Sequence, residues 1–195
     1  MKTIPLAFIA SWLVLALALL SPAKAEATGA PAGGPYVPTP HAIVERMLTL
    51  AKVGPGDYLI DLGSGDGRLA IAAVELHKAR GAAGIEIDAS LVRQAAGHAK
   101  VAGLSDRVTF IAGDLFAANV EKATVVTLYL LPQILGQVEA KLRRELRPGA
   151  RIVSHDYPLP HWKPEEVVTF ETAEKVPISG TPRTVLYLYR VPERK

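Results

Sequence analysis

Residues 61–68, which read DLGSGDGR, are the part of this sequence whose residue types and spacing could do chemistry. Glycines at alternate positions let a backbone turn tightly and approach a ligand with no Cβ in the way. The spacing G-x-G-x-G differs from the G-x-G-x-x-G of dinucleotide-binding loops, and no Gly-Lys-Ser or Gly-Lys-Thr follows, as a P-loop requires. The stretch therefore predicts a ligand-binding loop that matches neither of these phosphate-binding patterns.

Three carboxylates near this loop indicate the kind of ligand. Asp61 ends an apolar run just before the glycines, where it would repel a pyrophosphate and attract an amino group or another cation. Glu86 stands 19 residues beyond Gly67, the usual place for an acid that accepts both hydroxyls of a ribose. Asp114 follows a third apolar run. Each acid alone is as readily explained as a helix cap or turn residue, but a ligand with an ammonium group, a ribose and an adenine, and without phosphate, fits all three. S-adenosylmethionine is such a ligand.

The apolar patterns predict the elements that position these acids. We expect strands over 58–60, 82–87, 107–111, 125–130 and 150–154, and helices over 40–50, with Thr39 as cap, 68–79, 90–101 and 133–146. Alternating strands and helices predict an α/β, doubly wound, mostly parallel sheet, with ligands bound beyond the carboxyl ends of the strands. The closing segments 167–172 and 184–191 have no helix between them and predict an antiparallel hairpin, with an antiparallel strand at an edge of a seven-stranded sheet. The strand order does not follow from the pattern.

Composition excludes several classes of function, and the N-terminal segment indicates how the chain is organised. The chain has 195 residues, 49% of them hydrophobic, no cysteine and a net charge of +3, which excludes disulfide scaffolds, thiolate metal sites and cysteine nucleophiles and gives no argument for nucleic acid. Isolated histidines without metal-like spacing predict no metal site. Residues 1–25, with the charge-free run 4–20, predict a signal peptide or a membrane anchor, hence an exported, periplasmic or secreted domain, or a membrane-anchored one. Residues 26–35 predict a flexible linker and residues 36–195 the compact domain.

Four stretches give the sequence a family resemblance: YVPTP at 36–40, DLGSGDGR at 61–68, ATVVTLYLL at 123–131, and the stretch 148–157, from PG through VSHDY. Trp162 and YLY at 187–189 match as well. Across residues 36–192 the chain resembles class I S-adenosylmethionine-dependent methyltransferases, and within them the archaeal broad-specificity and mitochondrial protein-lysine methyltransferases. The resemblance implies a Rossmann-like methyltransferase fold. No Asn-Pro-Pro-Tyr motif stands at the reactive position, which argues against methylation of adenine or cytosine amino groups.

The resemblance also implies roles for individual residues. Asp61 and Gly63 would hold the methionine moiety, Glu86 the ribose, and Asp114 with the Leu115 amide the adenine. The expected cofactor-binding set is completed by Ser64, Gly65, Gly67 and Ile87. Residues 36–39 would form a lid, and residues 129–131 would lie at the reactive centre.

For a lysine acceptor the nucleophile must arrive neutral, and a dry aromatic channel favours the neutral amine and can hold its methylated products. Tyr36, Tyr129 and Trp162 are candidates for that lining, although ordinary packing explains each as well. His155 ends the fifth predicted strand and could shuttle a proton or belong to a turn. The candidate catalytic residues are thus Tyr36, Tyr129 and His155.

The predicted function is methylation of protein lysine by in-line displacement from S-adenosylmethionine, by a monomer with a protein partner, no nucleic acid and possible membrane attachment through residues 4–20. The alternatives are a small-molecule methyltransferase and a non-catalytic exported protein that retains the fold. Five basic residues also lie between 141 and 151. They predict either a solvated helix end, favoured by the helix dipole, or a docking patch for an acidic partner.

Overall fold

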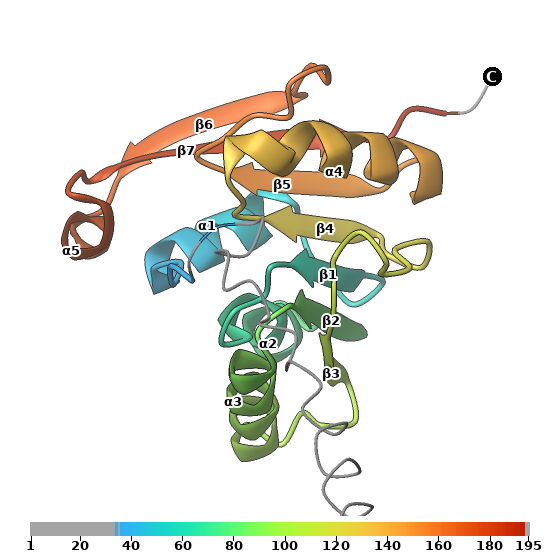
Figure 1. Cartoon of the computed structure of the whole chain (residues 1–195), viewed down its shortest axis with the longest axis vertical. Helices are drawn as coiled ribbons and strands as arrows, with labels where there is room; N and C mark the ends of the chain where they lie inside the picture. The colour runs from blue at the N-terminus through green and yellow to red at the C-terminus, as the bar shows by residue number, and fades with distance from the viewer. Residues whose placement is uncertain (1–33, 35, 194–195) are drawn as a thin grey trace, which may run out of the picture.

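Seven strands form one sheet in the computed structural model, which describes residue 34 and residues 36–193 (Figure 1). The order is β3-β2-β1-β4-β5-β7-β6, and all neighbours are parallel except those of β7. The strands are β1 (Tyr58–Leu62), β2 (Gly81–Glu86), β3 (Val108–Ala112), β4 (Val125–Leu128), β5 (Arg151–His155), β6 (Glu166–Glu171) and β7 (Arg183–Arg190). The helices are α1 (His41–Leu50), α2 (Arg68–Glu75), α3 (Ala89–Val101), α4 (Pro132–Glu145) and α5 (Val176–Ser179). The predicted doubly wound, mostly parallel sheet is confirmed.

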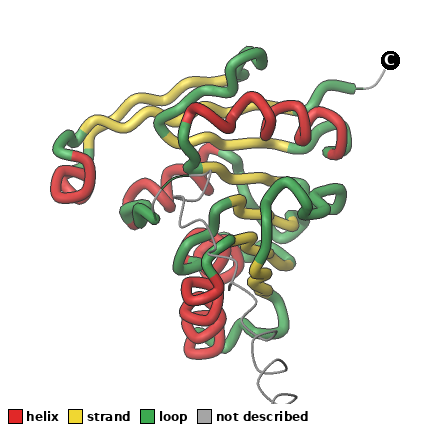
Figure 2. Tube along the Cα trace, viewed as in Figure 1, coloured by secondary structure: helices red, strands yellow, loops and turns green. Residues whose placement is uncertain are grey.

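The sheet has a hydrophobic core on each face, because successive side chains of a strand point to opposite sides. In β1, Leu59 packs into the core that α1, α2 and α3 cover. Its neighbour Ile60 packs into the core that α4 covers. Figure 2 shows these helices on both sides of the strands. Two covered faces explain why the parallel strands read as uninterrupted apolar runs rather than as alternating ones.

The second face is covered by a loop where no helix crosses it. The connection 113–124 between β3 and β4 contains no helix, and its residues Leu115, Phe116 and Val120 pack into the same core as α4. This loop carries Asp114 and Leu115 to the carboxyl end of the sheet, where both line the pocket described below.

The C-terminal hairpin differs from the prediction in two respects. The antiparallel strand β7 lies between β5 and β6 rather than at the edge. Burial explains this, since Leu186, Leu188 and Tyr189 of β7 are almost fully buried, whereas Val167 of the edge strand β6 is half exposed. The connection between the two strands is also not free of helix, because it contains a 3₁₀ turn at Ala173–Lys175 followed by α5.

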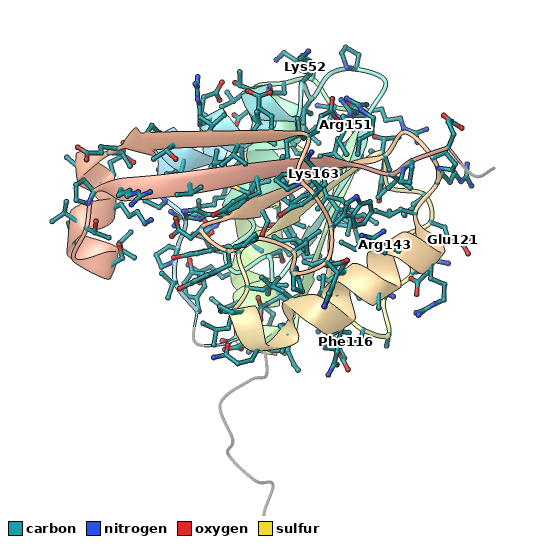
Figure 3. All side chains as sticks on the ribbon, turned by 90° about the horizontal axis from the view of Figure 1, so that it is seen from above. Lys52, Phe116, Glu121, Arg143, Arg151 and Lys163 are labelled. Carbon is teal, nitrogen blue, oxygen red and sulfur yellow. The ribbon has the colours of Figure 1, made fainter. Side chains whose placement is uncertain are left out.

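Two smaller predictions are also corrected. Pro40, not Thr39, caps α1, and no side-chain cap bond is made there. The basic stretch divides in two. Arg143, Arg144 and Arg147 are exposed at the C-terminal end of α4, as a solvated helix end requires. Buried Lys141 instead binds Glu145 at 2.6 Å, and Arg151 of β5 binds Asp57 and the carbonyl oxygen of Ala51. Figure 3 shows Arg151 beside Lys52 and well apart from Arg143 of α4.

The predicted signal peptide or anchor at 1–25 and most of the linker at 26–35 lie outside the described residues. Within the described part of the chain, every helix is too short or too polar to cross a membrane.

Candidate active site

A pocket of about 370 Å³ opens at the carboxyl ends of β1, β2 and β4. It brings together most of the residues that the sequence singled out. Those in its wall are Tyr36, Asp61, Gly63, Ser64, Gly65, Glu86, Ile87, Asp114, Leu115 and Tyr129. Gly67 and His155 are the two predicted site residues that do not line it.

The glycine loop follows β1 and is tied to the end of β2. The backbone N–H groups of Gly63 and Ser64 both donate to the carbonyl oxygen of Ile85, at 2.9 and 3.0 Å. Gly63 and Gly65 have φ values of 80° and 52°, a left-handed conformation that side chains disfavour. A Cβ at Gly65 would overlap the ring of Tyr36, and one at Gly63 would come within 2.9 Å of Leu130. The loop therefore keeps an open cradle at the floor of the pocket, where the buried Ser64 hydroxyl has no hydrogen-bond partner among the described residues.

Gly67 has a different role from the one predicted. It precedes α2 with a φ of 81°, and a Cβ there would overlap the Phe110 ring of β3 and approach Ala95 of α3. The absence of a side chain lets the start of α2 approach Phe110 of β3 and Ala95 of α3 at the base of the loop. Gly67 thus serves packing behind the pocket and not its lining.

Asp61 is a buried carboxylate in β1 with one hydrogen-bond donor in the described structure. Its partner in the parallel register is Thr127 of β4, whose hydroxyl donates to Asp61 Oδ1 at 2.7 Å. Burial, together with the charges of Glu86 and Asp66, raises the pKa of Asp61 to about 7, against the lowering effect of the Thr127 hydrogen bond. A carboxylate so poorly compensated is prepared to bind a cation.

Glu86 and Asp114 both carry local structure as well as facing the pocket. Glu86 Oε2 accepts from the Gly65 amide at 2.9 Å, and Oε1 accepts from the Asp88 amide at 3.0 Å, so this side chain joins the glycine loop to the start of α3. Asp114 Oδ1 accepts from the Phe116 amide at 2.8 Å. The two alternatives for these acids, turn residue and ligand-facing residue, are therefore compatible.

The pocket wall is strongly acidic. Asp61, Asp66, Glu86, Asp88 and Asp114 face one cation in the described part of the chain, Arg68. Arg68 is itself bound to Asp66, with N–O distances of 2.6 to 3.1 Å. Such a pocket favours a cationic guest and disfavours a polyphosphate.

The Asp66–Arg68 pair also holds the segment above the loop. Arg68 donates to the carbonyl oxygen of Thr39 at 2.9 Å. Burial raises the pKa of Asp66, but the hydrogen bonds and charge of Arg68 outweigh it and hold that pKa below its usual value. Burial and the Asp66 charge raise the pKa of Tyr36, which therefore stays neutral. Residues 36–39 are thus fastened across one side of the pocket.

The opposite end of the pocket is aromatic and apolar. Tyr129, Tyr157, Leu130 and Leu131 line it. Burial, followed by the charge of Asp156, raises the pKa of Tyr129 to about 12. His155 lies behind Tyr129, with ring centroids 4.0 Å apart. Neither of its ring nitrogens makes a hydrogen bond with a described residue, although Nε2 lies 3.5 Å from Asp156 Oδ2. Burial lowers the pKa of His155 to about 4, so its ring is neutral at physiological pH.

Trp162 does not belong to this lining, contrary to the prediction. It packs against Tyr189, with ring centroids 6.1 Å apart, and under the guanidinium of Arg143. Its position follows from the second hydrophobic core, in which it is largely buried.

Several residues of the site were missed because their importance depends on tertiary contacts. Thr127 looks like any β-branched residue of a buried strand until the parallel register places it beside Asp61. Asp66 and Arg68 stood within the glycine motif, and their closeness in sequence was an available signal. Tyr157 stood just beyond the fifth predicted strand, but nothing in the pattern showed which way it points. Among the described residues, no group of three His, Cys, Asp or Glu side chains is placed to hold a metal ion.

Comparison with known proteins agrees with this geometry. Residues 61–166 match the model of the ANTKMT methyltransferase domain. A protein-lysine N-methyltransferase of Saccharolobus islandicus is 38% identical over 83% of this chain and 96% of its own length. The adenine nucleotide translocase lysine N-methyltransferase of mouse is 41% identical over 69% of this chain, but this chain spans only 58% of that protein.

A crystal structure also resembles the chain. It is described as an RNA methyltransferase from Salinibacter ruber in complex with S-adenosylhomocysteine, and it superposes with a TM-score of 0.73 and 45% sequence identity over 82% of this chain and 96% of its own. The acidic pocket suits the ammonium and ribose of that cofactor, and the glycine cradle suits its close approach. The chain therefore belongs to the ANTKMT methyltransferase family and is a class I methyltransferase that uses S-adenosylmethionine.

Proposed function

We propose that this chain methylates lysine side chains of proteins. The observation that carries the proposal is the division of the pocket into an acidic end, with Asp61, Glu86 and Asp114, and an aromatic end, with Tyr129 and Tyr157. The names of the archaeal and mouse relatives support a lysine acceptor. The acidic pocket wall attracts a lysine ammonium, and aromatic faces bind ammonium and methylammonium groups.

Each predicted cofactor residue except Gly67 takes a proposed role in this scheme. Asp61 accepts from the ammonium of the methionine moiety, Glu86 from the ribose hydroxyls, and Asp114 with the Leu115 amide pairs with the adenine edge. Gly63, Ser64 and Gly65 leave room for the methionine chain, and the exposed Ile87 offers an apolar surface to the adenine.

When bound, the cofactor supplies an electrophilic methyl group on a sulfonium. The acceptor amine attacks that carbon in line, a new N–C bond forms, and the C–S electron pair remains on sulfur. The residues of the chain orient and desolvate the amine. Tyr129, kept neutral by its raised pKa, offers a phenol and a ring face beside it. His155 stands behind Tyr129, outside the pocket lining, and supports that ring.

RNA is the alternative acceptor that the description of the Salinibacter structure raises. The pocket wall favours protein, because phosphates would meet five carboxylates and an arginine already paired with one of them. The basic residues at 141, 143 and 151 also bind carboxylates or carbonyl groups of their own chain.

The test is transfer of tritiated methyl groups by residues 36–195 to three acceptor classes: a bacterial protein extract with poly-L-lysine, total RNA, and small primary amines. We expect acid-stable label in protein, released on hydrolysis as methylated lysine. Label confined to RNA or to small amines would refute the lysine proposal while leaving the methyltransferase assignment intact.

Glu86→Gln is expected to weaken binding of S-adenosylhomocysteine roughly 10- to 100-fold. The variant replaces a charged acceptor of two ribose hydrogen bonds by one neutral oxygen, a loss of about 1.5–3 kcal/mol. Isothermal calorimetry measures the affinity, with Glu121→Gln, an exposed residue outside this pocket, as the matched control. Equal affinities of the two variants would remove Glu86 from the ribose site.

We further propose that residues 1–25 direct the domain into or across a membrane. The support is the charge-free run 4–20 followed by AKA at 23–25. A phosphatase reporter fused after residue 195 should be active only on the far side of the inner membrane. A reporter that stays inactive, with a cytosolic reporter active at the same position, would contradict export.

A further inference from the structure

Lys175 is a buried cation that the proposed reaction does not use. It lies in the 3₁₀ turn at the tip of the β6–β7 hairpin and is 3% exposed. Its ammonium donates to Asp156 Oδ1 at 2.8 Å and to the carbonyl oxygen of Arg183 at 2.5 Å, and it lies 2.6 Å from Asp156 Oδ2. The two contacts with Asp156 join the hairpin tip to the residue that follows β5, whereas the contact with Arg183, the first residue of β7, lies within the hairpin.

Asp156 has a backbone conformation that calls for an explanation. Its φ is 61°, in the left-handed region that residues with a Cβ enter at a cost. Lys175 holds the carboxylate of Asp156, and the backbone N–H of Asp156 donates to the Val185 carbonyl oxygen at 2.7 Å. Both restraints come from the hairpin, one from its tip and one from β7.

The turn at Asp156 sets the direction of two neighbouring side chains. His155, before it, ends β5 and stacks against Tyr129. Tyr157, after it, lines the pocket, and its backbone is held by its N–H bond to the His155 carbonyl oxygen at 2.8 Å and by the Ser154 hydroxyl at 2.6 Å. An extended residue at 156 would carry the chain straight on past the end of β5, so Tyr157 would point elsewhere.

We infer that Lys175 is a positioning residue for the acceptor end of the active site, acting through the Asp156 turn on Tyr157 and on the His155–Tyr129 stack. The hairpin tip in which it lies extends beyond the carboxyl ends of β4 and β5 (Figure 1), which is the edge of the sheet where the pocket opens. The inference rests on the proposed function only in taking the acceptor to be a protein lysine.

A stabilising role alone accounts poorly for this arrangement. Buried ion pairs are often no more stabilising than apolar residues of the same volume, because both charges must be desolvated. The Lys175–Asp156 pair fixes the turn at Asp156 next to the pocket, which an apolar contact between the same residues would not do. The distinguishing readout is therefore the acceptor KM, compared with the affinity for the cofactor.

The test compares two double variants that both remove the ion pair. In Lys175→Met with Asp156→Gly, glycine adopts the positive φ freely and the turn is expected to persist. In Lys175→Met with Asp156→Ala, the same charges are lost but the left-handed turn is disfavoured. The acceptor is the protein that the methyl-transfer assay labels most strongly. We expect the alanine variant to raise the KM for this acceptor about fivefold or more. The KM of the glycine variant should stay within about twofold of that of the unaltered enzyme. Both should bind S-adenosylhomocysteine within about twofold of the unaltered enzyme.

Equal acceptor KM values for the two folded double variants would overturn the inference, and so would a parallel loss of cofactor affinity in the alanine variant. Lys175→Met alone, if it folds, is expected to resemble the alanine variant, because the partly buried Asp156 carboxylate loses the cation that holds it. Should the unaltered enzyme label no protein lysine, the proposed function fails separately. Crystal structures of the two double variants then decide the positioning role, which is refuted if Tyr157 keeps its place in both.

Discussion

Asp61→Asn is expected to weaken binding of S-adenosylhomocysteine about 30- to 1000-fold at pH 7.5. Asparagine keeps the shape of the side chain and can still accept from Thr127, but it loses the charge that we propose binds the ligand ammonium. A charge-assisted hydrogen bond in a buried site contributes roughly 2–4 kcal/mol, which corresponds to that range of affinities. Isothermal calorimetry measures it, with Asp106→Asn as a control that alters an exposed acid outside the pocket.

The same carboxylate predicts a pH dependence of cofactor binding. Because the pKa of Asp61 is raised to about 7, a large share of the ligand-free protein carries a proton there at pH 6. Ligand binding requires the ionised form, so affinity should rise as the pH increases from 5.5 to 7.5. The Asp61→Asn variant should lack this rise, and an unaltered slope in the variant would assign the titration to another group.

Whereas the affinity for the ligand should rise with pH, the contribution of Asp61 to the stability of the ligand-free protein should fall with pH. The folded state holds the Asp61 proton more tightly than the unfolded state, so its contribution to stability falls as the pH rises from about 3.8 to about 7. Above pH 7 the burial of this charge costs the native state up to roughly 4 kcal/mol. Asp61→Asn removes that cost and is expected to raise the free energy of unfolding at pH 8, as urea denaturation can measure. A variant that loses both stability and ligand affinity would show a structural role only.

Much of this site could be predicted because a parallel sheet gathers the ends of its strands. Asp61, Glu86 and Asp114 each lie at or just after the carboxyl end of an apolar run, and parallel neighbours place them at one edge whatever the strand order. Local pattern was therefore sufficient for the cofactor end of the pocket. Element bounds shifted by one to four residues, because helix ends depend on capping contacts that the pattern does not show.

The acceptor end could not be predicted, because it depends on contacts between distant segments. Tyr157 reaches the pocket through a left-handed aspartate that is held by Lys175 from the hairpin tip. His155 is neutral because the end of β5 is buried behind Tyr129. Trp162 was separated from the pocket by its packing on Tyr189. None of these relations leaves a periodic signal in the sequence.

The glycines show the same limit, since sequence alone does not say whether a glycine makes room for a ligand or for the protein itself. Gly65 leaves space under Tyr36 in the pocket wall, whereas Gly67, two residues on, leaves space for Phe110 of β3 and Ala95 of α3. The first is expected to matter for binding and the second for folding, a distinction that a substitution can test.

Gly67→Ala is expected to destabilise the protein by about 2–4 kcal/mol and to lower its Tm by roughly 5–15 °C. The added methyl group enters a left-handed position at φ 81° and overlaps the Phe110 ring, so the cost combines backbone strain with overpacking. Thermal unfolding measures the effect, and Gly97→Ala is the matched control. Gly97 lies within α3, exposed, with no atom within 4 Å of its added Cβ, so alanine there should stabilise by up to about 1 kcal/mol. A Gly67→Ala protein as stable as the Gly97→Ala control would show that the start of α2 does not need its close approach to Phe110 and Ala95.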